Sequence, residues 1–157
     1  MQPAAEIVGI AGNHDFIGQT RPEVLRLLPW RYLCDETIKL GGLVIHGSPW
    51  TPTFFDWAFM QDDRDLVDRW NLIPQHVDVL VTHGPPHGYG DRSNRDTREG
   101  SLTLLERLLE LDRLRLHIYG HIHEDPGQWT LGKATLVNAT VVDDSYRFTN
   151  AARVFDL

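Results

Sequence analysis

IAGNHD (10–15) is a short apolar run that ends in a polar turn with glycine and histidine, and later segments repeat this arrangement. They are IHGSPW (45–50), VTHGPP (81–86) and IYGHIHE (118–124). Short β-branched runs bounded by such turns predict strands, which we place at 6–11, 43–46, 77–82, 116–119 and 135–142. Because helical patterns separate these runs and no linker or repeat interrupts them, we predict an α/β fold and one domain over residues 1–157.

Helical patterns occupy the intervals between the predicted strands. The clearest covers 101–111, where Ser101 is a suitable N-cap, and weaker patterns cover 62–70 and 23–28. The spacing of apolar residues predicts which side chains face the core. They are Leu102, Leu105, Leu108 and Leu109 in the first helix, and Leu66, Val67 and Trp70 in the second.

The composition limits the classes of protein that the chain can represent. It is 41% hydrophobic and 24% charged, as expected for a globular domain. Its net charge of −7 argues against non-specific binding to nucleic acid or to an anionic membrane. The sequence has neither a long apolar run nor a signal-peptide pattern, so we expect a cytoplasmic protein. Cys34 is the single cysteine, which excludes an internal disulfide, and we expect it to be a small buried residue.

Polar residues at the ends of the predicted strands are candidate metal ligands. Because ligands gather outside the carboxyl ends of strands in open α/β sheets, these turns are expected to converge. Imidazole nitrogens with an amide oxygen and no thiolate suit Mn²⁺, Fe, Zn²⁺ or Ni²⁺ better than Ca²⁺. The i, i+2 spacing of His121 and His123 would direct the two rings to opposite sides of an extended segment. The predicted pocket contains Asn13, His14, His46, His83, His121 and His123.

Three of these motifs together carry a family resemblance. GNHD (12–15), THGPP (82–86) and GHIH (120–123) resemble, in order and spacing, the last three metal motifs of the calcineurin-like metallophosphoesterases. GSPWTP (47–52), WNLIP (70–74) and THGPPHGYGD (82–91) are similar to the metallophosphoesterase-domain-containing proteins, which are related to class III cyclic nucleotide phosphodiesterases. The resemblance implies an αββα sandwich and hydrolysis of cyclic nucleotides or related phosphodiesters with Mn²⁺.

The resemblance also implies a role for each matching residue. Asn13, His83 and His121 would ligate one ion, His123 would reach a second ion, and His14 would stabilise the transition state or protonate the leaving group. The family's D-x-H and G-D motifs do not precede GNHD here. We therefore expect a partial domain without its first strands, which holds at most one ion well, hydrolyses phosphodiesters slowly by itself, and self-associates through an exposed sheet edge.

Other residues are weaker candidates for a functional role. His46, Trp50 and His87 are candidate substrate contacts, because each lies in or beside a predicted turn of the pocket. The aromatic segment 50–59 is either a wall for a nucleobase or ordinary packing, and we favour packing for most of it. Arg92, Arg95 and Arg98 alternate with acidic residues, which is typical of a solvated loop.

The sequence leaves more than one function open. The first is a metal-dependent phosphoesterase that acts on small phosphoester substrates, by a two-metal mechanism when complete. A second is a catalytically degenerate remnant that binds a metal or none and acts through interactions. A third is a fragment completed by strands from another chain. For the polar residues at the strand ends, the simplest alternative to metal binding is that they cap turns.

Overall fold

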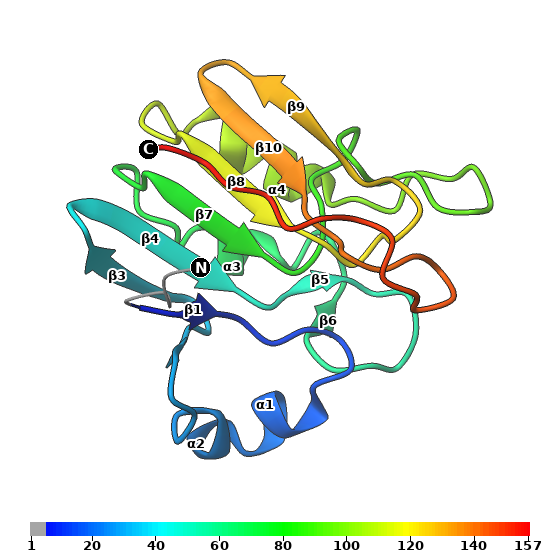
Figure 1. The fold of residues 1–157 in the computed structure, drawn as a ribbon, viewed down its shortest axis with the longest axis horizontal. Coiled ribbons are helices and arrows are strands. Elements are labelled where there is room, and N and C mark those ends of the chain that lie inside the picture. Colours follow the sequence, from blue (N-terminus) through cyan, green and yellow to red (C-terminus); the bar gives the residue numbers. More distant parts are fainter. Residues whose placement is uncertain (1–5) are drawn as a thin grey trace.

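The computed structural model describes residues 6–157, and its centre is a six-stranded sheet (Figure 1). In spatial order the strands are β3 (Glu36–Leu40), β4 (Leu43–Ser48), β7 (Val79–Thr82), β8 (Leu116–Tyr119), β10 (Ala134–Asn138) and β9 (Gly127–Leu131). Strands β4, β7, β8 and β10 are parallel, and β3 and β9 join the edges as antiparallel strands. The predicted strands at 43–46, 77–82, 116–119 and 135–142 are confirmed, so four carboxyl ends open on one edge of the sheet.

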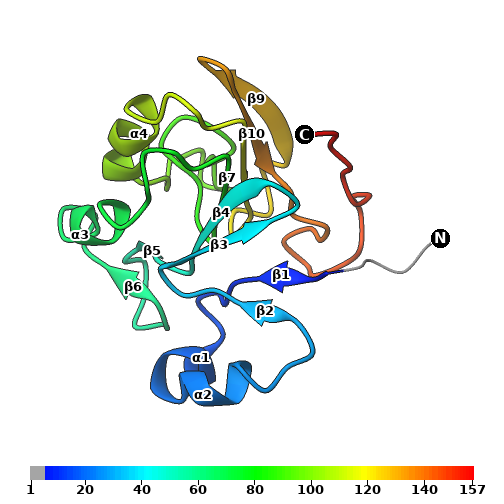
Figure 2. The same cartoon turned by 90° about the vertical axis from the view of Figure 1, so that its left-hand side faces the viewer.

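The helices α3 (Val67–Trp70) and α4 (Leu102–Leu109) lie on one side of this sheet (Figure 2). The predicted N-cap is confirmed, because the Ser101 side chain accepts a hydrogen bond from the Leu104 backbone N–H at 2.9 Å. Between helices and sheet lies the main core, in which a buried apolar side chain typically contributes about 1.5–3 kcal/mol. Its fully buried members include Leu66, Trp70, Leu80, Leu104 and Leu136.

The prediction of which helical residues face this core is partly wrong. Leu104 and Leu108 are buried, whereas Leu102 and Leu109 are 53% and 65% exposed. The inward stripe of α4 therefore runs through the i, i+4 pair at 104 and 108, whereas Leu102 and Leu109, seven residues apart, share the opposite face of the helix. In the other helical segment Leu66 and Trp70 are buried as predicted, but Val67 is 39% exposed.

A second layer lies on the opposite side of the sheet from α3 and α4 (Figure 2). It contains the parallel pair β1 (Val8–Gly9) and β2 (Arg31–Tyr32), with α1 (Phe16–Thr20) and α2 (Pro22–Leu25) beside it. Phe155 of the C-terminal segment packs on the same face as Val79 and Val137. This layering confirms the α/β sandwich, although the strand predicted at 6–11 has only two residues in regular pairing.

Several elements were not predicted. They are α1, β2, β3, β5 (Thr51–Pro52), β6 (Met60–Gln61) and β9. Cys34 is partly exposed rather than buried, and it packs beside Tyr32 and Ala58. In the part of the chain that the structure describes, no helix is both long and apolar enough to cross a membrane. Self-association through a sheet edge stays a prediction.

Candidate metal centre

The turns after β7 and β8 bring His83 and His121 together. The His83 backbone N–H donates to the Ser48 carbonyl at 3.2 Å, and the Gly120 N–H donates to the His83 carbonyl at 3.0 Å. These bonds continue the pairing of the parallel strands into the turns. The two imidazole rings consequently lie 4.7 Å apart, centroid to centroid, at an angle of 58°.

The GNHD turn after β1 reaches the same point from the second layer. The Asp15 carboxylate accepts the Gly12 N–H at 2.7 Å, the Asp15 N–H donates to the Gly12 carbonyl at 3.0 Å, and the turn is thereby closed. The Asn13 carbonyl accepts the Ala58 N–H at 3.1 Å, which anchors the turn to the segment before β6. Buried Asn13 then places its Oδ1 atom 2.8 Å from His83 Nε2.

Position 12 of this turn requires glycine because the His83 ring lies close to the backbone there. A Cβ atom at Gly12 would lie 2.6 Å from His83 Cε1 and 2.8 Å from Nδ1, which is closer than real Cβ atoms come. The His83 ring is thus packed directly on the backbone of the turn. The position of this imidazole depends on Gly12 as well as on its own strand.

The GHIH turn has a left-handed residue at its centre. His121 has φ +68°, which is uncommon for a residue with a side chain and is held here by surrounding contacts. One of these comes from buried Asn138, whose Nδ2 donates to the Ile122 carbonyl at 2.7 Å and to the Gly90 carbonyl at 2.9 Å. The segment is a tight turn, so the expected extended geometry of His121 and His123 is wrong, and both line the same cavity.

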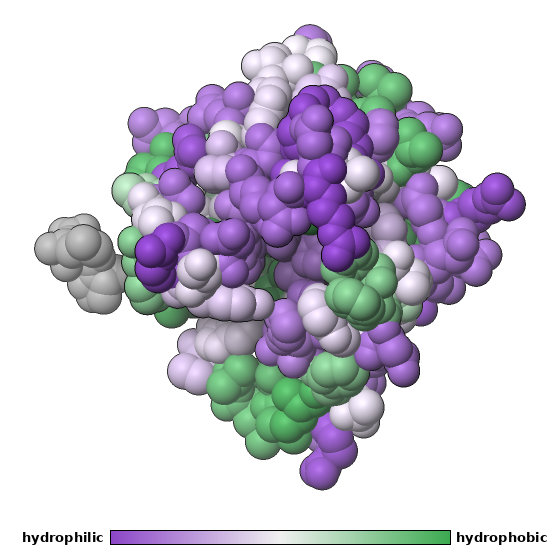
Figure 3. All heavy atoms as spheres, turned by 90° about the vertical axis from the view of Figure 1, so that its right-hand side faces the viewer, coloured by the Kyte–Doolittle hydropathy of each residue, from purple (hydrophilic) through white to green (hydrophobic). Residues whose placement is uncertain are grey.

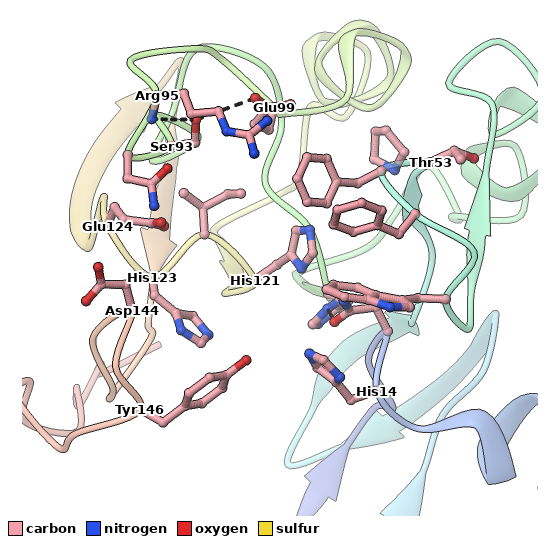
Figure 4. Close-up of a pocket in the computed structure, with 18 residues that line it drawn as sticks. His14, Thr53, Ser93, Arg95, Glu99, His121, His123, Glu124, Asp144 and Tyr146 are labelled. Carbon is pink, nitrogen blue, oxygen red and sulfur yellow. Dashed lines mark hydrogen bonds between the residues drawn. The ribbon is translucent and has the colours of Figure 1, made fainter.

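His123 and His14 lie at opposite parts of the cavity rim (Figure 4). His123 Nδ1 is 3.2 Å from the Asp143 carbonyl, which can only accept, so Nδ1 carries the proton and Nε2 keeps its lone pair. Metal-binding histidines commonly have such a partner on the second nitrogen. The exposed His14 ring lies 4.7 Å from the Trp57 ring.

These residues surround a cavity of about 420 Å³. Figure 3 shows it as a hollow at the strand-end face, with hydrophilic surface over one side and hydrophobic surface on another. The predicted residues that line it are Asn13, His14, His83, His121 and His123. The structure therefore brings together the residues of all three motifs that carry the family resemblance.

Burial keeps the two central imidazoles neutral. Burial, with a smaller contribution from the neighbouring imidazoles, lowers the pKa of His83 to about 3 and that of His121 to about 4. Neutral imidazole is the form that binds a metal ion. The centre is thus preset for ligation at neutral pH.

Asn13, His83 and His121 supply some, but not all, of the ligands that one metal ion needs. In this structure His83 Nε2–H donates a hydrogen bond to Asn13 Oδ1 at 2.8 Å, and an ion bound between these two atoms would replace that proton. The distance is close to the separation of about 3 Å between two neighbouring ligand atoms that each lie about 2.1 Å from an ion in octahedral geometry. His121 adds a second imidazole beside them. Within residues 6–157, however, no three His, Cys, Asp or Glu side chains are grouped closely enough to hold an ion. Asn13 would therefore be needed beside the two imidazoles to hold an ion. Water or a substrate would fill the other coordination positions of that ion.

The three weaker substrate candidates do not line the cavity, so their prediction as pocket residues is wrong. His46 points into the core from β4, where Thr37 Oγ1 lies 2.8 Å from its Nδ1, and burial lowers its pKa to about 4. Trp50 donates to Asp35 Oδ2 at 3.0 Å, with the Arg69 guanidinium 4.1 Å above its ring. His87 turns toward Asp91, 3.7 Å away.

The sequence analysis missed part of the cavity wall. Buried Phe59 packs edge to face on Trp50 as ordinary core, with the ring centroids 5.6 Å apart, which confirms the preference for packing at Phe59. The same preference is wrong for Phe54, Phe55 and Trp57, which line the cavity because the loop between β5 and β6 carries them over the strand ends. The polar lining residues that were not singled out are Thr53, Ser93, Asn94, Glu99, Glu124, Asp144 and Tyr146, and Arg95 was assigned to a solvated loop.

An α/β sandwich that gathers imidazoles and an amide oxygen at its strand ends is typical of a metal-dependent enzyme. The family model described as Calcineurin-like phosphoesterase matches residues 1–125, and the chain belongs to this family. Its members are metal-dependent hydrolases of phosphoester bonds. The resemblance predicted from the three motifs is thereby confirmed.

Curated relatives place the chain more narrowly. It is 41% identical to human Metallophosphoesterase domain-containing protein 1 over 128 residues, which are 80% of this chain and 39% of the relative. It is 40% identical to the UPF0046 protein T07D4.2 of Caenorhabditis elegans over 127 residues, 80% of this chain and 32% of the relative. The chain thus spans less than half the length of these relatives. A solved structure that is 20% identical has the same fold, with a TM-score of 0.63 over 84% of this chain and 56% of the other.

Proposed function

We propose that the cavity is the centre of a metal-dependent phosphodiesterase, with Asn13, His83 and His121 holding one divalent ion. The observation that carries this proposal is the 2.8 Å approach of Asn13 Oδ1 to His83 Nε2. The two residues are 70 positions apart in sequence and come from different layers. The family resemblance implies Mn²⁺, and the donor set of imidazoles with an amide oxygen also suits Fe, Zn²⁺ or Ni²⁺.

The remaining histidines have separate proposed roles. His123, with its Nε2 lone pair available, would reach a second ion, as the two-metal mechanism of the family requires. A bound divalent ion would supply positive charge for the phosphoryl oxygens. His14 projects from the turn beside Asn13, and it would hold or deliver the proton that the leaving oxygen needs.

The proposed substrates are small phosphodiesters, cyclic nucleotides among them. The test is the release of nitrophenolate from bis(4-nitrophenyl) phosphate by chain freed of metal, with and without added Mn²⁺, followed by a 2′,3′-cyclic nucleotide. We expect slow hydrolysis that needs Mn²⁺ and stops with chelator. Mn²⁺ binding without any hydrolysis would favour the degenerate metal-binding alternative, and undiminished hydrolysis in chelator would exclude a metal mechanism. The cytoplasmic location stays a prediction.

A further inference from the structure

The cavity has one fixed positive charge. Its lining contains three carboxylates, from Glu99, Glu124 and Asp144, and Arg95 is the only lysine or arginine among the lining residues. The chain itself carries a net charge of −7. Because a phosphoester is anionic, the three carboxylates repel it, and Arg95 is the lining residue whose permanent charge attracts it.

Arg95 differs from the other arginines of its loop. Arg92 is paired with Asp96, and Arg98 is paired with Asp91 at 2.6 Å. Arg95 has no carboxylate partner within the described residues and is exposed to the cavity. Figure 4 places it across the cavity from Thr53, on the same side as Glu99. Its guanidinium donors are therefore available to a ligand.

The loop of residues 91–100 holds Arg95 in place. Fully buried Asp91 accepts the Gly88 and Gly100 N–H groups at 2.9 and 3.3 Å, which fixes the base of the loop. Nearer the tip, the Ser93 N–H donates to the Thr97 carbonyl at 2.9 Å. A loop braced in this way presents Arg95 without a large ordering cost when a ligand binds.

An aromatic wall lines another part of the cavity. Phe54 and Phe55 are 4.5 Å apart, and Phe55 and Trp57 are 5.1 Å apart, as ring centroids. Phe54 and Phe55 are 46% and 53% exposed, so much of their ring surface is open to a ligand. A planar organic group bound there would bury this surface and stack on the rings.

We propose that Arg95 binds the anionic group of the substrate and that the aromatic wall binds its organic group. The ligand class is then a phosphoester whose organic part carries a planar aromatic group. This inference rests on the proposed function for the phosphoester but assigns recognition to residues outside the metal motifs. Arg95 is a positioning residue that selects the ligand, and Phe55 sets which organic groups are accepted.

The test is the affinity of the chain for inorganic phosphate and for phenyl phosphate, measured by calorimetry in buffer with chelator. Arg95→Gln is expected to weaken both ligands about 10- to 100-fold, the range for losing charge-assisted hydrogen bonds. Phe55→Ala is expected to weaken phenyl phosphate about 2- to 10-fold and to leave inorganic phosphate unchanged. Arg92→Gln is the matched control, since it removes an arginine of the same loop that is already paired.

Equal affinities for Arg95→Gln and Arg92→Gln would overturn the proposal. So would an equal loss of both ligands in Phe55→Ala, or the absence of saturable binding to the wild-type chain. Because these affinities are measured without metal, a failure to bind Mn²⁺ would count against the proposed function and leave this result standing.

Discussion

The histidines of the cavity fall into an inner pair, which we call the buried pair because burial lowers the pKa of both rings, and a rim pair. His83 and His121 are only partly exposed and are held through backbone bonds of the main sheet, whereas His14 is exposed and His123 has one hydrogen bond to a loop carbonyl. Burial lowers the pKa of both members of the buried pair. A preformed and neutral pair suits metal ligation, whereas side chains at an open rim suit contact with a substrate.

The substitution expected to distinguish the functions of the two pairs most strongly is His14→Ala. We expect turnover to fall by about 10²- to 10⁴-fold, which is typical for the loss of a general acid, while the bound metal stays unchanged. The measurement is metal content by elemental analysis beside hydrolysis of bis(4-nitrophenyl) phosphate. If the variant lost metal but kept full activity per remaining ion, His14 would be a metal ligand and not the proton donor at the rim.

A smaller effect is expected from Gly12→Ala, which acts on the buried pair without replacing a ligand residue. The added methyl group would meet the His83 ring at 2.6 Å and displace it. We expect Mn²⁺ affinity to fall about 10- to 100-fold, as when an outer-shell partner is lost. Gly120→Ala is the control, because a Cβ there meets nothing within 4 Å. Equal affinities for both variants would show that the packing of His83 on the turn is not needed.

The comparison also explains which parts of the site could be predicted from sequence. The buried pair follows from short motifs, because strand, glycine and histidine are adjacent in the chain and the parallel strands bring their ends together. The aromatic wall and Arg95 belong to loops whose path depends on tertiary contacts, such as the anchor of the 91–100 loop on buried Asp91.

Side-chain direction explains the errors within the motifs. His46 precedes a glycine, as His83 does, but it lies inside β4 with its side chain on the core face. Strand register decides this direction, and a shift by one residue would reverse it. The short strand β3 paired with β4 was not predicted, so the register of His46 opposite Thr37 was not available from the sequence.

The smallest expected effect concerns His117, which is buried like a core residue but is not a candidate metal ligand. His117 is fully buried but does not line the cavity, and burial lowers its pKa to about 3 from a usual value near 6.5. Below about pH 6.5 the unfolded chain gains a proton that the folded chain cannot, so stability is complete at neutral pH and falls toward pH 3. The expected slope is about 1 kcal/mol per pH unit.

Denaturant unfolding of the wild type and of His117→Gln between pH 7 and pH 4 measures this contribution. Glutamine keeps a donor for Thr82 Oγ1, which lies 2.8 Å from His117 Nε2, but it does not titrate. The variant should lose less stability on acidification, and exposed His76→Gln should behave as the wild type. Parallel pH profiles for all three proteins would show that burial of His117 has no such effect.

The most direct test of the metal centre is a calorimetric titration of Mn²⁺ into the wild type, His83→Ala and His121→Ala. His76→Ala, which removes an exposed histidine away from the cavity, is the matched control. We expect saturable binding of Mn²⁺ to the wild type and to His76→Ala, and an affinity at least about 100-fold lower in His83→Ala and His121→Ala. Unchanged affinity in His83→Ala and His121→Ala would contradict the assignment of the buried pair as metal ligands.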